Sequence, residues 1–527
     1  MTQPLRATLV HDPAKVPSGG QVRHLTARIQ GARQGHGAGA VLIEIWYTII
    51  TVGLSVTFVI GIADSIQASA PGEGGPVMIA GELPAALVVL AAAGAVLSLA
   101  GRLGPVGLGG GGAAWWLPMP IDRRGLLRPT VLRWPSTTAA AGAVLAPLIV
   151  FAFGVDLTIS TVLAWAALGG ASFAALTALA AVAQSWHPGD RSGRSHRSNR
   201  VTAAVGDTVL LGATAAVAGL ALVGPAAASA SGWELGGGWW ASIPLLLAAV
   251  VGTLVAERRT ALLSGAGLRA LGSVGDRAQV AVLSLDLREL SRALTTGTGR
   301  ARRRGSLRLA PGGPRRAVVR ADLVLLARTP RLLVQIAVAA LLAVAATRVT
   351  LLGSGLPMYG TLVLTGFWAA NTSAAGARHA DMAPVLDRLL PLSAREVRLT
   401  RGVVPLAAAA VWTVTVLGLQ AARTGEPLWL ALALPWTLVL AVAALRSAYR
   451  PPPRASRVPV ASPMGSVPPT GGLFHGLDVA LVGTLPTAIA LYVGVVSSTL
   501  VTAQLVMAGL VVAVLVGVSG TKKQSRV

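Results

Sequence analysis

The chain has 527 residues, of which 53% are hydrophobic and 12% are charged, and its mean hydropathy is +0.67. Soluble proteins carry about 25% charged residues, so this composition excludes a soluble globular protein and a disordered chain. The net charge is +24, and the lack of cysteine excludes disulfides, thiolate metal sites and cysteine nucleophiles.

Twelve apolar stretches are long enough to cross a membrane, which takes about 20 mostly apolar residues in a helix. In chain order they cover residues 40–64, 83–101, 136–154, 158–184, 202–224, 239–256, 332–347, 358–377, 403–422, 428–446, 477–496 and 500–519. The sequence therefore predicts an all-α polytopic membrane protein with about 12 transmembrane helices.

The positions of Lys and Arg predict the orientation of these spans. Basic residues gather in cytoplasmic segments, and they do so here if both termini lie inside. Of the 44 Lys and Arg residues, only Arg348 and Arg423 then fall in outside loops. We expect a multi-pass protein of the cell membrane whose arginines face anionic lipids, which explains the net charge without nucleic acid.

The sequence also predicts an internal repeat. Aligning Pro120 with Pro391 sets an offset of 271 residues, and several rarer residues then match without further adjustment. The matching pairs are Arg124 with Arg395, Gly154 with Gly425, Trp165 with Trp436, Asp207 with Asp478, and Gly212 with Gly483. Each copy, 40–256 and 332–519, holds six predicted spans. Because six is even, the two copies enter the membrane in the same orientation, as a parallel repeat.

Cytoplasmic segments flank and join the two copies. We expect the linker 257–331 to carry an amphipathic helix, since leucines recur at helical spacing within it. Two further stretches before the first and seventh spans are predicted to lie flat in the interface. These segments are the basic N-terminal region 1–39 with its flat stretch 22–33, the linker with its helix 283–294 and flat stretch 318–330, and the tail 520–527.

No motif for catalysis or cofactor binding stands out. The chain has no Gly-Lys pair, so a nucleotide-binding P-loop is excluded, and the glycine run 109–112 is expected to be a loop. Its seven His residues lack metal-ligand spacing. We therefore predict no enzyme activity, no cofactor and no metal site in this chain.

The acidic pair Asp207 and Asp478 lies inside predicted spans, near their cytoplasmic ends. Carboxylates are costly in a membrane and are often functional there. Three alternatives remain open: charges solvated at the interface or paired with Arg200 or His475, a structural role at the seam between the two copies, or a site for substrate or protons.

A charged loop follows the second span of each copy, with an Arg four residues after a Pro. The first reads LPMPIDRRGLLR and the second reads LLPLSAREVRL. Since Pro suits the first turn of a helix, we expect it to open a short helix that projects Arg into the cytoplasm. Two roles for such a helix are open. Its charge sets the membrane topology, or it transmits a movement of a soluble partner to the membrane helices.

These two loops resemble the loop after span two in permease subunits of ABC-2 type exporters. The likeness extends to the basic interfacial segment before the first span, the six spans per unit and the short outside loops. In that family, six-span units pair and their cytoplasmic helices contact a separate ATPase; large outside domains of some relatives are absent here.

By this resemblance the chain is the membrane permease of an ATP-driven exporter, with an amphiphilic or lipid-like substrate. The residues that would contact the ATPase are Pro120, Asp122, Arg123, Arg124, Pro391, Arg395, Glu396 and Arg398. Two alternatives are an ion- or proton-coupled secondary transporter that uses Asp207 and Asp478, and a membrane scaffold without transport. An intramembrane enzyme is a fourth and weaker hypothesis.

Overall fold

A computed structural model describes most of the chain. It covers residues 18–34, 81–119, 121–155, 158–186, 194–223, 239–283, 312–349, 352–353, 355–382, 384–449, 460–462, 465–467 and 475–520. The predicted span 40–64 lies outside the described residues, as does the predicted helix 283–294 beyond its first residue. The described elements are helices, apart from one antiparallel hairpin of β1 (Val460–Ser462) and β2 (Gly465–Val467).

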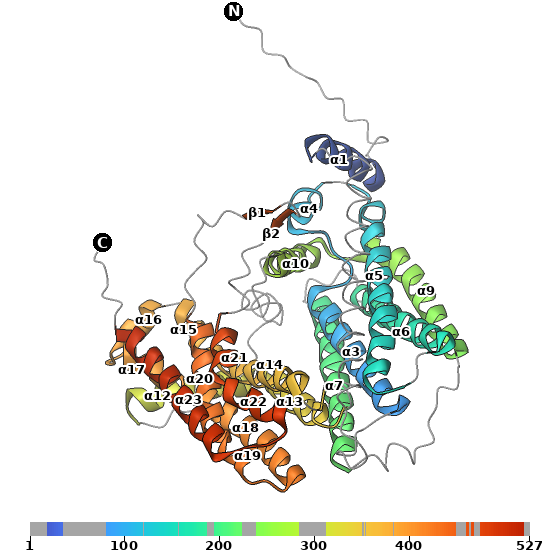
Figure 1. Ribbon diagram of the computed structural model, residues 1–527. Helices are drawn as coiled ribbons and strands as arrows, with labels where there is room; N and C mark the ends of the chain where they lie inside the picture. The colour runs from blue at the N-terminus through green and yellow to red at the C-terminus, as the bar shows by residue number, and fades with distance from the viewer. Residues whose placement is uncertain are drawn as a thin grey trace, which may run out of the picture.

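The first bundle is built from five long helices (Figure 1). They are α3 (Glu82–Leu103), α5 (Arg123–Ala152), α6 (Ile159–Ser185), α7 (Arg194–Val223) and α9 (Ser242–Arg259), with the single turns η2 (Trp239–Ala241) and η3 (Thr260–Leu262) at the two ends of α9. In it, α3 packs against α7, α5 against α6, and α6 against α9. One apolar cluster joins the start of α3 to the end of α5, so consecutive helices run in opposite directions.

Glycine lets the helix pairs of this bundle approach closely. A Cβ at Gly206 of α7 would lie 2.3 Å from the Ser98 nitrogen of α3, and one at Gly142 of α5 would lie 2.2 Å from the Gly169 oxygen of α6. Small residues at helix contacts are the usual means of association in membranes, because they allow backbone-to-backbone packing.

Three further helices cover one end of this bundle, which we call the elbow end. They are α1 (Gly19–Gln34), α4 (Gly110–Trp115) and α10 (Gly265–Leu283). The expectation of a loop at 109–112 is wrong, since Gly110 begins α4. Packing explains the difference: α4 contacts α10, and Gly272 of α10 lies so near Leu108 that a Cβ would come within 2.6 Å of its oxygen.

The second bundle follows the same alternation. Its elements are α12 (Gly313–Arg328), α13 (Pro330–Ala346), α14 (Gly355–Ser373), α15 (Ala375–Met382), α16 (Pro384–Arg388), α17 (Ala394–Arg401), α18 (Val403–Thr424), α19 (Leu428–Ala431), α20 (Ala433–Ala448), α21 (Leu477–Gly483), α22 (Leu485–Val493) and α23 (Ser498–Gly520). Its core holds the stacked rings of Trp412 and Trp436, whose centroids lie 6.2 Å apart, and Trp436 Nε1 donates to Thr487 Oγ1 at 2.8 Å.

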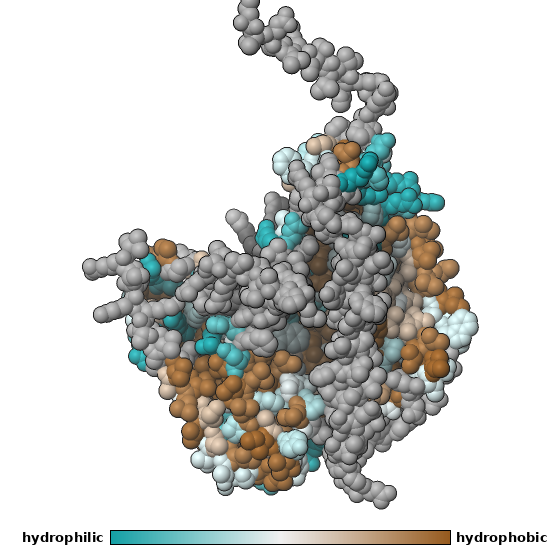
Figure 2. All heavy atoms as spheres, turned by 45° about the horizontal axis from the view of Figure 1, so that its top comes forward, coloured by the Kyte–Doolittle hydropathy of each residue, from teal (hydrophilic) through white to brown (hydrophobic). Residues whose placement is uncertain are grey.

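The described helices are those of a polytopic membrane protein. Seven are long and apolar enough to cross a bilayer, and α12 with α13 forms an eighth such stretch, bent by 84° before Pro330. The bend follows from that proline, which disfavours helical geometry in Thr329 before it. Each predicted span except 40–64 overlaps one or two of the described helices, and 477–496 is divided between α21 and α22. Figure 2 shows apolar residues over the outer faces of both bundles.

The two bundles meet where α13 lies along α7. Val217 near the end of α7 shares an apolar cluster with Ala345 and Val349 near the end of α13. The two helices therefore run in the same direction, and the start of α13 lies toward the elbow end. We call this contact the seam.

Candidate functional site

The first charged loop lies at the start of α5, and we call residues 122–128 the first elbow. Asp122 is the N-cap of the helix: its Oδ1 accepts the Arg124 N–H at 3.1 Å and its Oδ2 accepts the Gly125 N–H at 2.9 Å. Capping satisfies N–H groups that a helix start leaves without partners. Pro120 lies outside the described residues. The helix begins at Arg123 with the acidic N-cap Asp122, so its first residue is not the proline that we expected there.

Helix α1, which covers the predicted interfacial stretch 22–33, docks on the first elbow. Arg23 Nη1 donates to the Gly125 oxygen at 2.8 Å, and the backbones touch at Gly19, where a Cβ would lie 2.3 Å from the Asp122 oxygen. A displacement of α1 would therefore act directly on the start of α5.

The other side of the first elbow is held by the end of α9. Glu257, with a side chain 11% exposed, pairs with Arg128 at 3.2 Å and with Arg124 at 3.6 Å. Arg123 Nη1 donates to the Leu263 oxygen at 2.8 Å. The Arg124 side chain stays 53% exposed, so it presents its charge outward while it touches the bundle.

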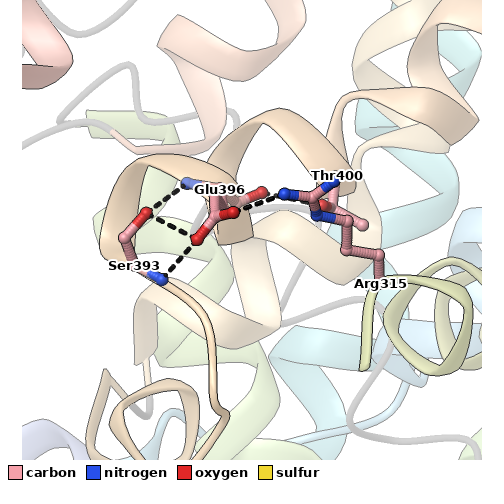
Figure 3. A network of polar contacts seen from close by, with 4 residues as sticks. All are labelled: Arg315, Ser393, Glu396 and Thr400. Atoms are coloured by element: carbon pink, nitrogen blue, oxygen red, sulfur yellow. Dashed lines mark hydrogen bonds and ion pairs between the residues drawn. The ribbon is translucent and has the colours of Figure 1, made fainter. Parts of the chain in front are cut away.

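The second charged loop forms α17, and we call residues 393–401 the second elbow. Ser393 and Glu396 make a capping box, in which Ser393 Oγ accepts the Glu396 N–H at 3.2 Å and Glu396 Oε2 accepts the Ser393 N–H at 2.8 Å (Figure 3). α17 precedes the apolar helix α18. The hydrogen bond from the Ser393 backbone, with help from Arg315, lowers the pKa of Glu396 to about 2.

Two ion pairs hold the flat helix α12 on the second elbow. Arg315 pairs with Glu396 (Figure 3), and Arg401 Nη1 pairs with Asp322 Oδ1 at 2.8 Å. Arg401 Nη2 also reaches Asp387 of α16 at 2.8 Å. Asp322 lies on α12, before the bend that leads into the membrane, and burial raises its pKa to about 6.

The remaining predicted residues of the second loop lie at its surface. Arg395 is exposed, and Arg398 stacks its guanidinium 5.2 Å from the centroid of the Tyr449 ring. Pro391 is exposed and lies two residues before the N-cap Ser393. The expectation that proline opens the helix is therefore wrong here, because a hydroxyl cap supplies what the first N–H groups need.

The two predicted acidic residues occupy different surroundings. Asp207 of α7 pairs with Arg102 of α3 at 2.5 Å and accepts from Ser98 Oγ at 2.5 Å, so its partner is Arg102 and not Arg200. Asp478, at the start of α21, accepts the Gly476 N–H at 2.7 Å and pairs with Arg446 at 2.9 Å.

Both carboxylates are therefore paired with arginine, Asp207 in a mostly buried pair and Asp478 in a more exposed one. In the described part of the chain, no group of three or more His, Asp or Glu side chains could hold a metal ion.

Comparison with known proteins identifies a family. Residues 79–457 match the Family of unknown function (DUF6297). The chain belongs to this family. The DUF6297 region contains both elbows and the seam, whereas α1 and α21 to α23 lie outside it. No curated protein and no solved structure matches the chain.

Proposed function

We propose that this DUF6297 protein is the membrane permease of an ATP-driven exporter whose ATPase is a separate subunit. The observation that carries the proposal is the pair of elbows. Each is a capped, Arg-bearing helix start that clamps a flat helix, α1 or α12, and each leads directly into an apolar helix. In Figure 1, α1 lies over the start of α5, and α12 lies beside α17.

The positions of the helices support duplication of a six-span unit. α5 begins at Arg123 and α17 at Ala394, which are 271 residues apart, so the N-caps Asp122 and Ser393 are equivalent. At the other end, Gly154 after α5 has φ 70° and Gly425 after α18 has φ 72°. Glycine is favoured at such left-handed ends of helices.

The packing of the helices repeats as well. In the first bundle α3 packs against α7, α5 against α6, and α6 against α9. In the second, α14 packs against α22, α18 against α20, and α20 against α23. Trp165 of α6 and Trp436 of α20 are equivalent by the same offset, and both are buried. This agreement supports a parallel repeat with twelve spans and two elbows facing the cytoplasm.

The elbows suggest how force would enter the membrane. An α-helix transmits an axial push because each residue is tied to the fourth residue before it. α5 is continuous from the first elbow through its spanning part, and α17 leads into α18 through Gly402. Closure of the ATPase would shift the elbows and their flat helices together, and so open or close the seam between the bundles.

The test is co-purification with the ATPases encoded beside this gene. We expect one of them to bind the wild-type protein, and Arg395→Glu with Arg124→Glu to weaken that binding by about tenfold or more, since charge reversal places like charges at the contact. Arg133→Glu, an equally exposed arginine further along α5, is the matched control and should leave binding unchanged.

Two results would contradict the proposal: no neighbouring ATPase binds the wild-type protein, or the double variant keeps full binding and full stimulation of ATP hydrolysis. The substrate that we propose is amphiphilic, because the described spans offer a mostly apolar surface. This chain itself would supply no catalysis, and the ATPase would supply all of it.

A further inference from the structure

The seam holds a buried cluster of charged residues. These residues have no part in the proposed coupling of an ATPase to the bundles through the elbows. Arg102 of α3 and Asp207 of α7 form an ion pair within the first bundle, and Arg331 opens α13 of the second bundle beside them. The cluster therefore spans the contact between the bundles, toward the elbow end.

The positive charge of this cluster is not balanced by the described residues. Asp207 is already engaged, since Arg102 Nη2 lies 2.5 Å from its Oδ2 and Ser98 donates to its Oδ1. Arg331 lies close enough to Arg102 and Asp207 for their charges to act on it. Its Nη1 is buried and has no hydrogen-bond partner among the described residues. Two guanidinium groups thus face one carboxylate.

The start of α13 adds to this positive potential. Pro330 is its first residue, and no side chain caps it. The N-terminal end of a helix carries a partial positive charge that favours anions and disfavours cations such as Arg331. A buried cation at this position is costly unless an anion accompanies it.

We propose that the cluster at the seam, Arg331 with the Arg102–Asp207 pair, binds a phosphate group. One excess positive charge matches the single negative charge of a phosphodiester. The planar guanidinium of Arg331 fits two phosphate oxygens at once, which a point charge does not. The site lies toward the elbow end, and the Asp207 side chain keeps 19% of its surface exposed.

The same chemistry has two sources, the headgroup of a phospholipid in the inner leaflet and a free phosphate ion. Both can be tested on the purified full-length protein in detergent, with thermal unfolding followed by the fluorescence of its 13 Trp residues. The probes are short-chain phosphatidylglycerol, the matching diacylglycerol without phosphate, and sodium phosphate against sodium chloride at equal ionic strength.

We expect phosphatidylglycerol to raise the unfolding midpoint of the wild-type protein and diacylglycerol to leave it unchanged. An equal effect of sodium phosphate would identify the free ion as sufficient, and an effect of the lipid alone would identify the headgroup; either result supports the site. Arg331→Gln should need about tenfold more ligand or more for the same shift. Arg316→Gln, the same change at an exposed position of α12, should respond like the wild type.

A second readout separates a binding residue from a structural one. Without ligand, Arg331→Gln should unfold at the same temperature as the wild type or higher, because it removes an unbalanced buried charge. A structural arginine would give the opposite sign. If Arg331→Gln does not fold, Arg331→Lys keeps the charge but loses the planar fork, and it should need severalfold more ligand.

The proposal is overturned if the wild-type protein responds to neither phosphatidylglycerol nor phosphate, or if both Arg331 variants respond as the wild type does. The test uses no ATPase and no transport, so its result is independent of the proposed function.

Discussion

A single added methyl group should weaken the attachment of α12 to the second elbow. Gly376 of α15 lies against the carboxylate of Asp322, and a Cβ at this position would come within 2.1 Å of Asp322 Oδ1 and 2.7 Å of Oδ2. Asp322 is 6% exposed and cannot swing into solvent without leaving Arg401. We therefore expect Gly376→Ala to break the pair between Asp322 and Arg401.

The size of the effect follows from what is lost. A hydrogen bond between charged groups contributes about 1.5–3 kcal/mol, and Arg401 would keep Asp387 as its second partner, which limits the damage. Against this, alanine in place of glycine within a helix stabilises by about 0.5–1 kcal/mol. The net expectation for Gly376→Ala is a loss of about 1–2 kcal/mol in the free energy of unfolding.

The assay is chemical unfolding in detergent, with Gly360→Ala as the matched control. Gly360 is also helical, on α14, and a Cβ there would meet nothing within 4 Å, so this variant should be neutral or stabilised by up to about 1 kcal/mol. If the two variants change stability equally, the contact between Gly376 and Asp322 does not hold α12, and the reasoning is refuted.

Two further predictions concern charge and topology. Because burial raises the pKa of Asp322 to about 6 from an ordinary value of about 4, the folded protein binds this proton more tightly. The stability from this group is complete below about pH 4 and is lost as the pH rises to about 6. In unfolding experiments across this range, the free energy of unfolding of the wild-type protein should therefore fall by about 2–3 kcal/mol. Asp322→Asn should remove most of that fall. The chain has no cysteine, so Arg124→Cys and Arg395→Cys should both react with an impermeant maleimide in inverted vesicles only, and Glu426→Cys in right-side-out vesicles only; reaction of the two elbows from opposite sides would exclude a parallel repeat.

Apolar segments were the most predictable part of the fold. Hydropathy predicted the apolar helices, of which seven in the described chain are long and apolar enough to cross a bilayer, because burial in lipid demands long apolar runs whatever their neighbours are. Most of the stretch 318–330 belongs to α12, and its position in the membrane interface stays a prediction. Short polar elements were less predictable. Helix propensity alone predicts a loop for the glycine run at Gly110, but packing against α10 stabilises a helix there.

The charged residues of the loops were predicted as a group, but their contacts were not. The sequence shows that Arg124 and Glu396 follow a proline, whereas Glu257 and Arg315, which bind them, lie more than 80 residues away along the chain. Arg102 was expected to be one more cytoplasmic charge. Only the folded chain brings it beside Asp207, and no local pattern marks that pair.

The proposed repeat shows which features an internal alignment can reveal. An N-cap at Asp122 or Ser393 and a left-handed glycine at Gly154 or Gly425 depend on the backbone of one helix alone, so they survive at a fixed offset. An ion pair depends on a second helix, whose sequence changes separately. At the 271-residue offset Asp207 and Asp478 therefore keep their identity while their partners differ: Arg102 lies on α3, three long helices before α7, and Arg446 lies on α20, the helix immediately before α21. Helix caps and left-handed glycines can therefore be predicted from an internal alignment, whereas the partners of charged residues have to be found in the structure.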